Sequence, residues 1–469
     1  MSFYLLVDFG STYTKISLID IDNGRLFERV NAHTSISVGV DKGFEEALKK
    51  LDEKVNLDKI EIKEVLACSS AYGGLKMIGI GITPEYTTEA AKRALVGAGA
   101  RLIKAYTYYL NDEDVEEIKN LNPDIILLTG GADGGNKDYI IKNAEKLKNL
   151  EDISLVIAGN SSAREEIEEV LKDGKTKYIF AENLMPDVNR FTPEDAKEKI
   201  RKIFMEKITH AKGMDKIDMI KDRVLMPTPT AVLKAAELMA LGTEKYEGFG
   251  DLIVVDIGGA TTDIHSVSDP HKEEKNILEG LRESFLKRTV EGDMGMRYSA
   301  LSAYENYKEG FLFCEYTEEE IIEKCKKRQE NPEIIFEDED ELKFDTIIGE
   351  NCVRVSINRH AGSLRTGYLD GHYVDYQDGK DLRFVKKVIG TGGVIINNKN
   401  PKNILEKIKF REKNKLVPEN PSYFSDEKYI LSHIGLLSTI DRHLAFKVLS
   451  ENLKPLAWKL LYYVNKIIF

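Results

Sequence analysis

One pattern occurs twice in this sequence, and the repeat limits the folds that the chain can adopt. Residues 4–19 and residues 252–267 each run from an apolar strand, through an aspartate and a turn rich in glycine and hydroxyl side chains, into a second apolar strand. An internal repeat of this kind indicates a duplicated supersecondary unit. The sequence therefore predicts two lobes, each built around one copy of the same β-hairpin.

The rest of the chain alternates between segments typical of strands and of helices. Three consecutive strands are predicted over 3–31, because the Asn23-Gly24 pair favours a tight hairpin turn. Residues 60–185 alternate strand and helix, which implies a parallel α/β sheet with helices on both faces. Within this stretch we expect a helix over 89–104. Residues 398–428 are polar and contain three prolines, so we expect a loop there.

The first turn, residues 8–15, has the composition of a phosphate-binding loop. Its glycine and hydroxyl residues leave backbone N–H groups free to wrap a phosphate. Asp8, at the end of the strand, can hold Mg²⁺ through water, because Mg²⁺ usually keeps part of its water shell. The candidate phosphate ligands here are Gly10, Ser11, Thr12, Thr14 and Lys15, and Lys15 would act as a point charge. The alternative is a plain hairpin with ordinary turn residues.

Two later segments fit the same chemistry. The turn at 256–263 offers Asp256 for metal or water, and its candidate phosphate ligands are Gly258, Gly259, Thr261 and Thr262. A strand near 388 ends in a glycine-rich turn, where a base or ribose could lie against bare backbone; its candidates are Gly390, Gly392 and Gly393. Each turn alone is a weak signal, but the three in this order predict a nucleotide site.

Composition excludes several other classes of protein. The net charge of −12 argues against a nucleic-acid binder with a broad basic surface. The four cysteines show no CxxC spacing, which favours free thiols in a reducing compartment. No apolar run reaches the roughly 20 residues of a membrane span, and Met1 leads directly into a predicted strand. We expect a cytoplasmic protein without a membrane partner.

In this order, the three motifs resemble the phosphate-1, phosphate-2 and adenosine motifs of the actin, Hsp70 and sugar-kinase superfamily. Residues 227–233 and 432–437 look like its two connecting helices. The resemblance implies an α/β fold of two ribonuclease H-like domains with a nucleotide cleft between the lobes, and ATP with Mg²⁺ as cofactors. The expected division is a first lobe over 1–245, a second lobe over 246–430, and C-terminal helices over 431–469 that return to the first lobe.

A closer resemblance covers nearly the whole chain. Residues 67–77, 129–136, 254–263 and 291–297 look like the accessory proteins of methylaspartate (glutamate) mutase, the GlmL/MutL family. This resemblance implies an ATP-hydrolysing chaperone that binds the subunits of an adenosylcobalamin-dependent mutase and releases damaged cobalamin. Asp8 and Asp256 would then be the catalytic and metal-binding residues. The motifs do not name the partner, so a related aminomutase stays open.

Several alternatives share the expected fold. The first is a small-molecule kinase, which would need a positioned general base beside the γ-phosphate. The others are an iron–sulfur activator of dehydratases, which the scattered cysteines disfavour, and an actin-like filament protein. The glycine-rich segment 129–136 could bind an anion at a helix N-terminus or could be a structural turn. The sequences 263–265 and 370–372 begin like a cobalamin-binding motif but lack its glycine, so we predict no direct corrinoid ligation.

Overall fold

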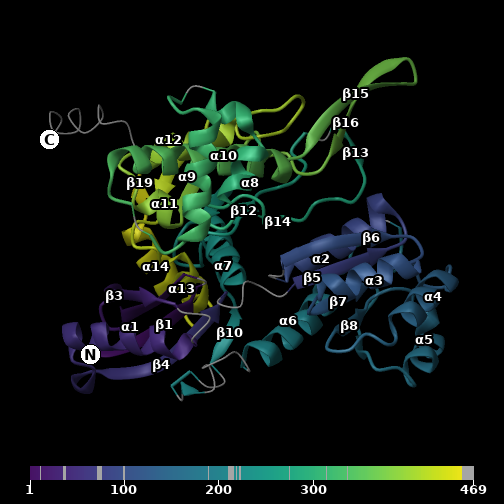
Figure 1. Ribbon diagram of the computed structural model, residues 1–469, viewed down its shortest axis with the longest axis horizontal. Helices are drawn as coiled ribbons and strands as arrows, with labels where there is room; N and C mark the ends of the chain where they lie inside the picture. The colour runs from purple at the N-terminus through teal and green to yellow at the C-terminus, as the bar shows by residue number, and fades with distance from the viewer. Residues whose placement is uncertain are drawn as a thin grey trace.

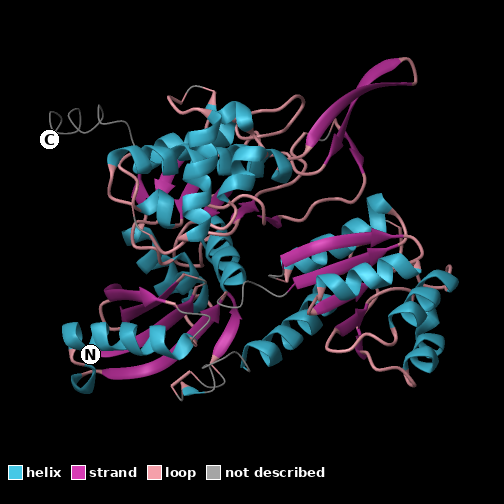
Figure 2. Ribbon diagram, viewed as in Figure 1, coloured by secondary structure: helices cyan, strands magenta, loops and turns pink. Residues whose placement is uncertain are grey.

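The chain forms three bodies, which are arranged around two central helices (Figure 1). The computed structural model describes residues 1–10, 12–34, 39–70, 76–98, 101–188, 190–209, 216–217, 219–220, 223–273, 275–312, 314–334 and 336–456. Two bodies are lobes with mixed sheets, and the third is a parallel sheet covered by helices (Figure 2). None of the described helices is both long and apolar enough to cross a membrane.

Lobe I contains the first mixed sheet. Its strands are β1 (Ser2–Phe9), β2 (Tyr13–Asp20), β3 (Arg25–His33), β4 (Glu61–Ser69) and β10 (Val224–Pro227). They lie in the order β10-β4-β1-β2-β3. The pairs β1–β2 and β2–β3 are antiparallel, whereas β4 runs parallel to both β1 and β10. Helix α1 (Val40–Val55) packs on β2 and β3 through an apolar face that includes Phe44 and Leu51.

Lobe II repeats this topology. Its strands are β11 (Leu252–Ile257), β12 (Thr262–Val267), β14 (Leu286–Glu291), β17 (Lys387–Thr391) and β18 (Ser422–Ser425), with a short edge strand β19 (Lys454–Pro455). The order β14-β12-β11-β17-β18 and the pairing directions match those of lobe I strand for strand. The chain therefore has the duplicated, two-lobed α/β fold of the actin, Hsp70 and sugar-kinase class, as the repeat predicted.

A third sheet is inserted between β4 and β10. Its strands are β5 (Lys76–Gly81), β6 (Arg101–Thr107), β7 (Ile125–Leu128), β8 (Ser154–Ile157) and β9 (Lys177–Phe180). All of them pair in parallel, in the order β6-β5-β7-β8-β9. Its helices are α2 (Glu89–Gly97), α3 (Asp112–Leu121), α4 (Asp138–Leu147), α5 (Arg164–Leu171) and α6 (Glu194–Thr209). We call residues 76–209 the inserted domain.

Lobe II also carries most of the remaining helices and a projecting arm. The helices are α8 (Ala300–Glu305), α9 (Glu318–Glu330), α10 (Glu339–His360), α11 (Gly393–Ile396) and α12 (Pro401–Leu405). Helix α10 crosses the buried face of β12 and β14, so its cysteine and isoleucine side chains fill the core of this lobe. The arm is a three-stranded sheet of β13 (Ile277–Glu279), β15 (Ser363–Leu369) and β16 (His372–Asp378), which extends away from the lobe in Figure 1.

Two helices join the lobes at the centre of the molecule. They are α7 (Thr228–Leu241) and α13 (Leu431–Leu437), at the two segments where connecting helices were expected. Helix α14 (Arg442–Asn452) follows and packs on α13 and α7. The two connecting helices cross closely, because Gly435 leaves room for the backbone of Ala231. Apolar side chains of both lobes meet there in one buried cluster.

Two of the predicted elements differ from the structure. The helix expected over 89–104 ends at Gly97, and 101–107 forms strand β6 instead. Pairing with β5 decides this, because a run of leucine, isoleucine, alanine and tyrosine with interspersed basic residues forms a strand when a neighbouring strand pairs with it. The loop expected over 398–428 contains α12 and the strand β18, which pairs with β17. Alternation over 60–185 did predict the parallel sheet, although β4 belongs to lobe I.

Replacing Gly435 with alanine should destabilise the fold. The added Cβ would lie 1.8 Å from the carbonyl oxygen of Ala231, so the connecting helices would have to move apart. We expect the free energy of unfolding to fall by about 1–3 kcal/mol, the usual cost of overpacking. Denaturant unfolding measures this loss of stability. Gly393→Ala is the control, because a Cβ added at Gly393 meets no atom within 4 Å. Equal midpoints for the two variants would contradict the close crossing.

Candidate functional site

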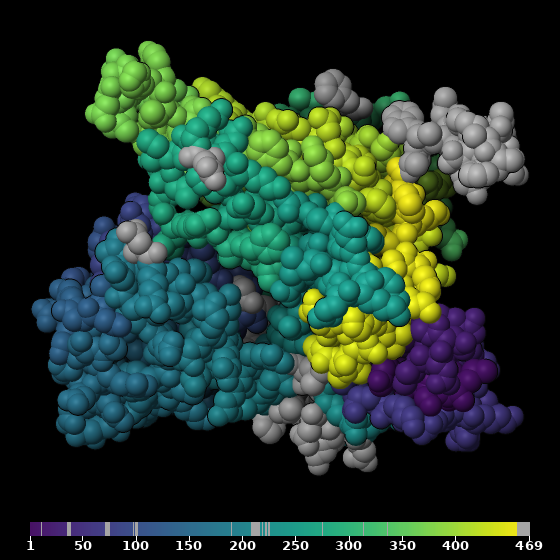
Figure 3. All heavy atoms as spheres, turned by 180° about the vertical axis from the view of Figure 1, so that it is seen from behind, coloured from purple at the N-terminus to yellow at the C-terminus, as the bar shows by residue number. Residues whose placement is uncertain are grey.

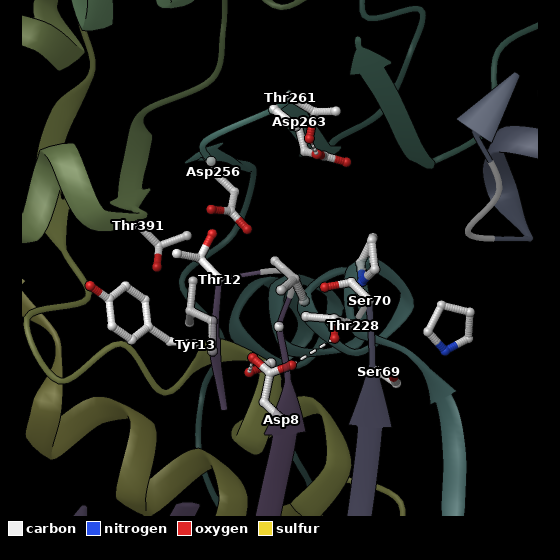
Figure 4. Close-up of a pocket in the computed structure, with 18 of the residues that line it drawn as sticks. Asp8, Thr12, Tyr13, Ser69, Ser70, Thr228, Asp256, Thr261, Asp263 and Thr391 are labelled. Carbon is white, nitrogen blue, oxygen red and sulfur yellow. Dashed lines mark hydrogen bonds between the residues drawn. The ribbon is translucent and has the colours of Figure 1, made fainter. Parts of the chain in front are cut away.

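A cavity of about 190 Å³ lies where the two hairpin turns face each other across the lobes (Figure 4). The first turn contributes Asp8, Gly10, Thr12 and Lys15, and the second contributes Asp256, Gly258, Gly259 and Thr261. In Figure 4, Asp8 and Asp256 approach the same space from opposite sides. The topology explains this meeting, because both turns follow the first strand of equivalent sheets.

Asp8 is fully buried and accepts hydrogen bonds from several elements. Lys15 Nζ donates to its Oδ2 over 2.9 Å, Ser432 Oγ donates to Oδ2 over 3.0 Å, and Thr228 Oγ1 donates to Oδ1 over 2.7 Å. Burial alone would raise the pKa of Asp8, but the charge of Lys15 and these donors lower it below its usual value. The carboxylate is therefore ionised, and it ties β1 to both connecting helices.

Lys15 lies between Asp8 and an aromatic ring. Its Nζ is 3.8 Å from the ring centroid of Tyr429, a cation–π contact. Burial would lower the pKa of Lys15, yet the Asp8 carboxylate raises it above its ordinary value. Tyr429 has a φ of 52°, a conformation that is uncommon for an aromatic residue and often marks a functional position. No local pattern in the sequence points to Tyr429, because its role depends on a contact with a distant strand.

Asp256 has the opposite electrostatic environment. Burial and the neighbouring Asp263 carboxylate raise the pKa of Asp256 to about 7, although Lys15 opposes the shift. Asp263 itself is paired: Arg288 Nε donates to its Oδ1 over 2.7 Å. Thus Asp8 is held ionised, whereas Asp256 titrates near neutral pH. Arg288 was also not anticipated from the sequence, since it lies on β14, outside the three motifs.

The other predicted site residues divide by position. Thr14 is buried, and its hydroxyl pairs with Thr34 over 2.8 Å, so it does not line the cavity. Thr262 and Gly390 are buried beneath it, whereas the neighbouring Thr391 lines it. Gly392 adopts a φ of 100° against Ile257, and beside Gly393 there is open space. Ser11 lies outside the described residues. The cavity therefore brings together most of the candidates of the first two turns, whereas Gly390, Gly392 and Gly393 of the third motif do not line it.

The donor set fits a magnesium ion in part. Carboxylate oxygens are the ligands that Mg²⁺ prefers, and it commonly takes one or two of them together with phosphate oxygens and water. Asp8 and Asp256 face the cavity from both sides. Within the described part of the chain, no group of three or more metal-ligating side chains is clustered. A magnesium ion here would thus share Asp8 and Asp256 with waters and with a bound phosphate group.

Fold and site together define a two-lobed protein with the actin-like ATPase fold. A family model described as "MutL protein" matches residues 4–453. The Protein MutL of Clostridium tetanomorphum is 46% identical over 445 residues, which cover 93% of this chain and 96% of that protein. The chain therefore belongs to the MutL protein family.

Solved structures with a similar fold are more distant. A nucleotide-free acetone carboxylase is 11% identical with a TM-score of 0.38, and the match covers 93% of this chain and 70% of the carboxylase chain. The gluconate kinase of Lactobacillus acidophilus is 11% identical with a TM-score of 0.35, and the match covers 96% of this chain and 90% of the kinase chain. Likenesses this distant do not indicate a shared activity.

Asp256→Asn should stabilise the protein at alkaline pH. Folding raises the pKa of Asp256, so the free energy of unfolding of the wild-type protein falls as pH rises from about 4 to about 7. Asparagine carries no charge, so at pH 8 the free energy of unfolding of the variant should exceed that of the wild type by about 1–2 kcal/mol, allowing for solvent in the cavity. At pH 4 the two proteins should differ little. Denaturant unfolding at both pH values measures this, with the exposed Asp58→Asn as control. A gain that is equal at both pH values would contradict the assigned cause.

Proposed function

We propose that this protein binds and hydrolyses MgATP in the cleft and uses the cycle to reactivate an adenosylcobalamin-dependent glutamate mutase. The observation that carries the nucleotide part is the opposition of two equivalent turns, one with Asp8 and Lys15 and the other with Asp256, across one cavity. Glycines in both turns leave backbone N–H groups near the cavity, which suits a phosphate chain. Membership of the MutL family and the resemblance to mutase accessory proteins support the partner.

Each part of the cleft would have a role in binding or hydrolysis that follows from its position. The N–H groups of the two turns would hold the phosphates, and Lys15 would exchange part of its contact with Asp8 for a phosphate oxygen. Asp8 and Asp256 would hold Mg²⁺ through water, which would neutralise phosphate charge in the cleft. Asp256 would also orient the attacking water. The backbone at 390–393 would lie under the adenosine.

Release of damaged cobalamin would follow from lobe movement. Nucleotide that bridges both turns favours one lobe arrangement over another, and only such a difference in affinity can shift the equilibrium. The moving surfaces would hold the mutase subunit in one state and release it in the other. No direct contact with cobalamin is needed in this cycle.

A small-molecule kinase is the second candidate. It is favoured by the same pKa of about 7 at Asp256, because a general base of that strength could take a proton from an acceptor hydroxyl. A panel of sugars and carboxylates discriminates the two proposals. Release of ADP that one such compound stimulates, with transfer of phosphate to it, would favour the kinase.

ATP turnover should depend on Asp8. Asp8→Asn removes the charge that orients Lys15 and would hold the metal water, so we expect turnover to fall at least about 100-fold. Release of inorganic phosphate from purified protein with MgATP measures this, and Asp58→Asn is the matched control on the exposed surface of lobe I. Unchanged turnover in Asp8→Asn would contradict hydrolysis in this cleft.

The partner is tested with a cobalamin-inactivated glutamate mutase. Mutase activity should recover when the protein, MgATP and fresh adenosylcobalamin are present, and should not recover with Asp8→Asn. Recovery that needs no nucleotide would contradict an ATP-driven cycle. A protein that turns over ATP but leaves the mutase inactive would contradict the partner and keep the ATPase.

A further inference from the structure

The inserted domain is attached to both lobes in different ways. The chain enters it after β4 and leaves it before β10, two neighbouring strands of lobe I. Its helix α2, however, contacts β14 of lobe II. Leu281 of lobe II is 6% exposed and belongs to the same buried apolar cluster as Ala90 and Ala94 of α2. Figure 3 shows the inserted domain, in blue and teal, against the green surface of lobe II.

Arg93 fixes the outer part of this contact. Its Nη1 donates to the carbonyl oxygens of Leu281 and Arg282, over 3.0 and 3.1 Å. Its Nη2 lies 3.3 Å from Glu283, and its Nε donates to Glu89 on its own helix over 2.9 Å. Arg93 does not line the cavity between the two turns. It therefore holds α2 on lobe II without touching the candidate nucleotide site.

Arg288 fixes the inner part and reaches the cavity. Its side chain is only 4% exposed, and its Nη1 donates to the carbonyl oxygen of Val96 in α2 over 3.1 Å. Its Nε donates to Asp263 at the end of the second turn over 2.7 Å. One guanidinium thus joins the inserted domain, β14 and the turn that faces the cavity.

We propose that Arg288 is a positioning residue that couples nucleotide occupancy of the cleft to the seating of the inserted domain on lobe II. This inference rests on the proposed function, because it assigns a form of regulation to the same cleft. The position of the inserted domain on lobe II would then depend on whether the cleft holds nucleotide. Such coupling is reciprocal: whatever loosens α2 must also change nucleotide affinity.

The direction of the coupling follows from charge. Asp8, Asp256 and Asp263 all lie at the cavity, so a polyphosphate meets three carboxyl groups there. Arg288 neutralises Asp263 while the Val96 carbonyl holds the guanidinium in place. When α2 leaves lobe II, Arg288 loses that support and the repulsion between Asp263 and phosphate grows. The seated domain is therefore the state that binds ATP more tightly.

The test loosens α2 at the residue that does not touch the cleft. In Arg93→Ala the dissociation constant of MgATP should rise about fivefold to tenfold, at the lower end of usual coupling factors. Glu283 keeps its ion pair with Lys287 at 2.6 Å, so the variant leaves no unpaired buried charge. Arg93→Lys should restore part of the affinity, because lysine can still pair with Glu283. Lys92→Ala is the matched control on the same helix, since the ion pair that Lys92 makes among the described residues is within α2, with Glu89.

A distance measurement reads the seating directly. Spin labels at Glu169→Cys in the inserted domain and Glu315→Cys in lobe II, with Cys314→Ser, report the separation by pulsed resonance; both glutamates are exposed. MgATP should narrow the wild-type distance distribution, and Arg93→Ala should broaden it. The unfolding midpoint without nucleotide should change little, which separates coupling from a general loss of structure.

Each outcome decides between the proposals. An unchanged MgATP dissociation constant in Arg93→Ala overturns the coupling, whether or not the distances broaden. Weaker binding in Lys92→Ala to the same degree overturns it as well. If wild-type protein binds no MgATP at all, the proposed function fails and the coupling fails with it.

Discussion

The buried ion pair of Asp8 and Lys15 is the interaction on which the rest of the structure depends. A carboxylate with no exposure to water is costly unless donors surround it. Here the donors come from β2 and from both connecting helices, so satisfying one side chain fixes the point where the lobes join. A ligand that draws Lys15 away must therefore act on the same residues that hold the hinge. Cleft and hinge share one set of hydrogen bonds.

Local patterns in the sequence were sufficient to predict the duplicated lobes and the cleft between them. Each hairpin carries its own apolar runs, turn glycines and aspartate, so nothing distant is needed to recognise it. Strand β6 was missed because pairing with β5, not the alanine-rich sequence before it, decides its conformation. Tyr429 and Arg288 were missed for a related reason, because their partners lie far away in the chain. Short β18 is likewise defined by its neighbour β17.

The inserted domain is the feature that distinguishes this chain from a plain pair of lobes. One face of its parallel sheet has a core of its own, and on the other face α2 packs its small alanine side chains toward Leu281 of lobe II. A body that is covalently part of one lobe and packed on the other must respond to any change in the angle between them. The projecting arm of lobe II adds exposed Tyr368 and Tyr373 at its tip, 68% and 81% exposed. In the proposed cycle, the spacing between the arm and the inserted domain would change with the state of the cleft.

A structure of the protein with Mg²⁺ and a non-hydrolysable ATP analogue is the most direct test of nucleotide binding in the cleft. We expect the phosphates to lie between the turns at 8–15 and 256–263, with Lys15 on a phosphate oxygen and the metal bound through water to Asp8 and Asp256. Nucleotide density at the carboxyl edge of the inserted sheet, with an empty cleft, would contradict it. So would phosphates that contact one turn only, because the lobes would then have no reason to move together.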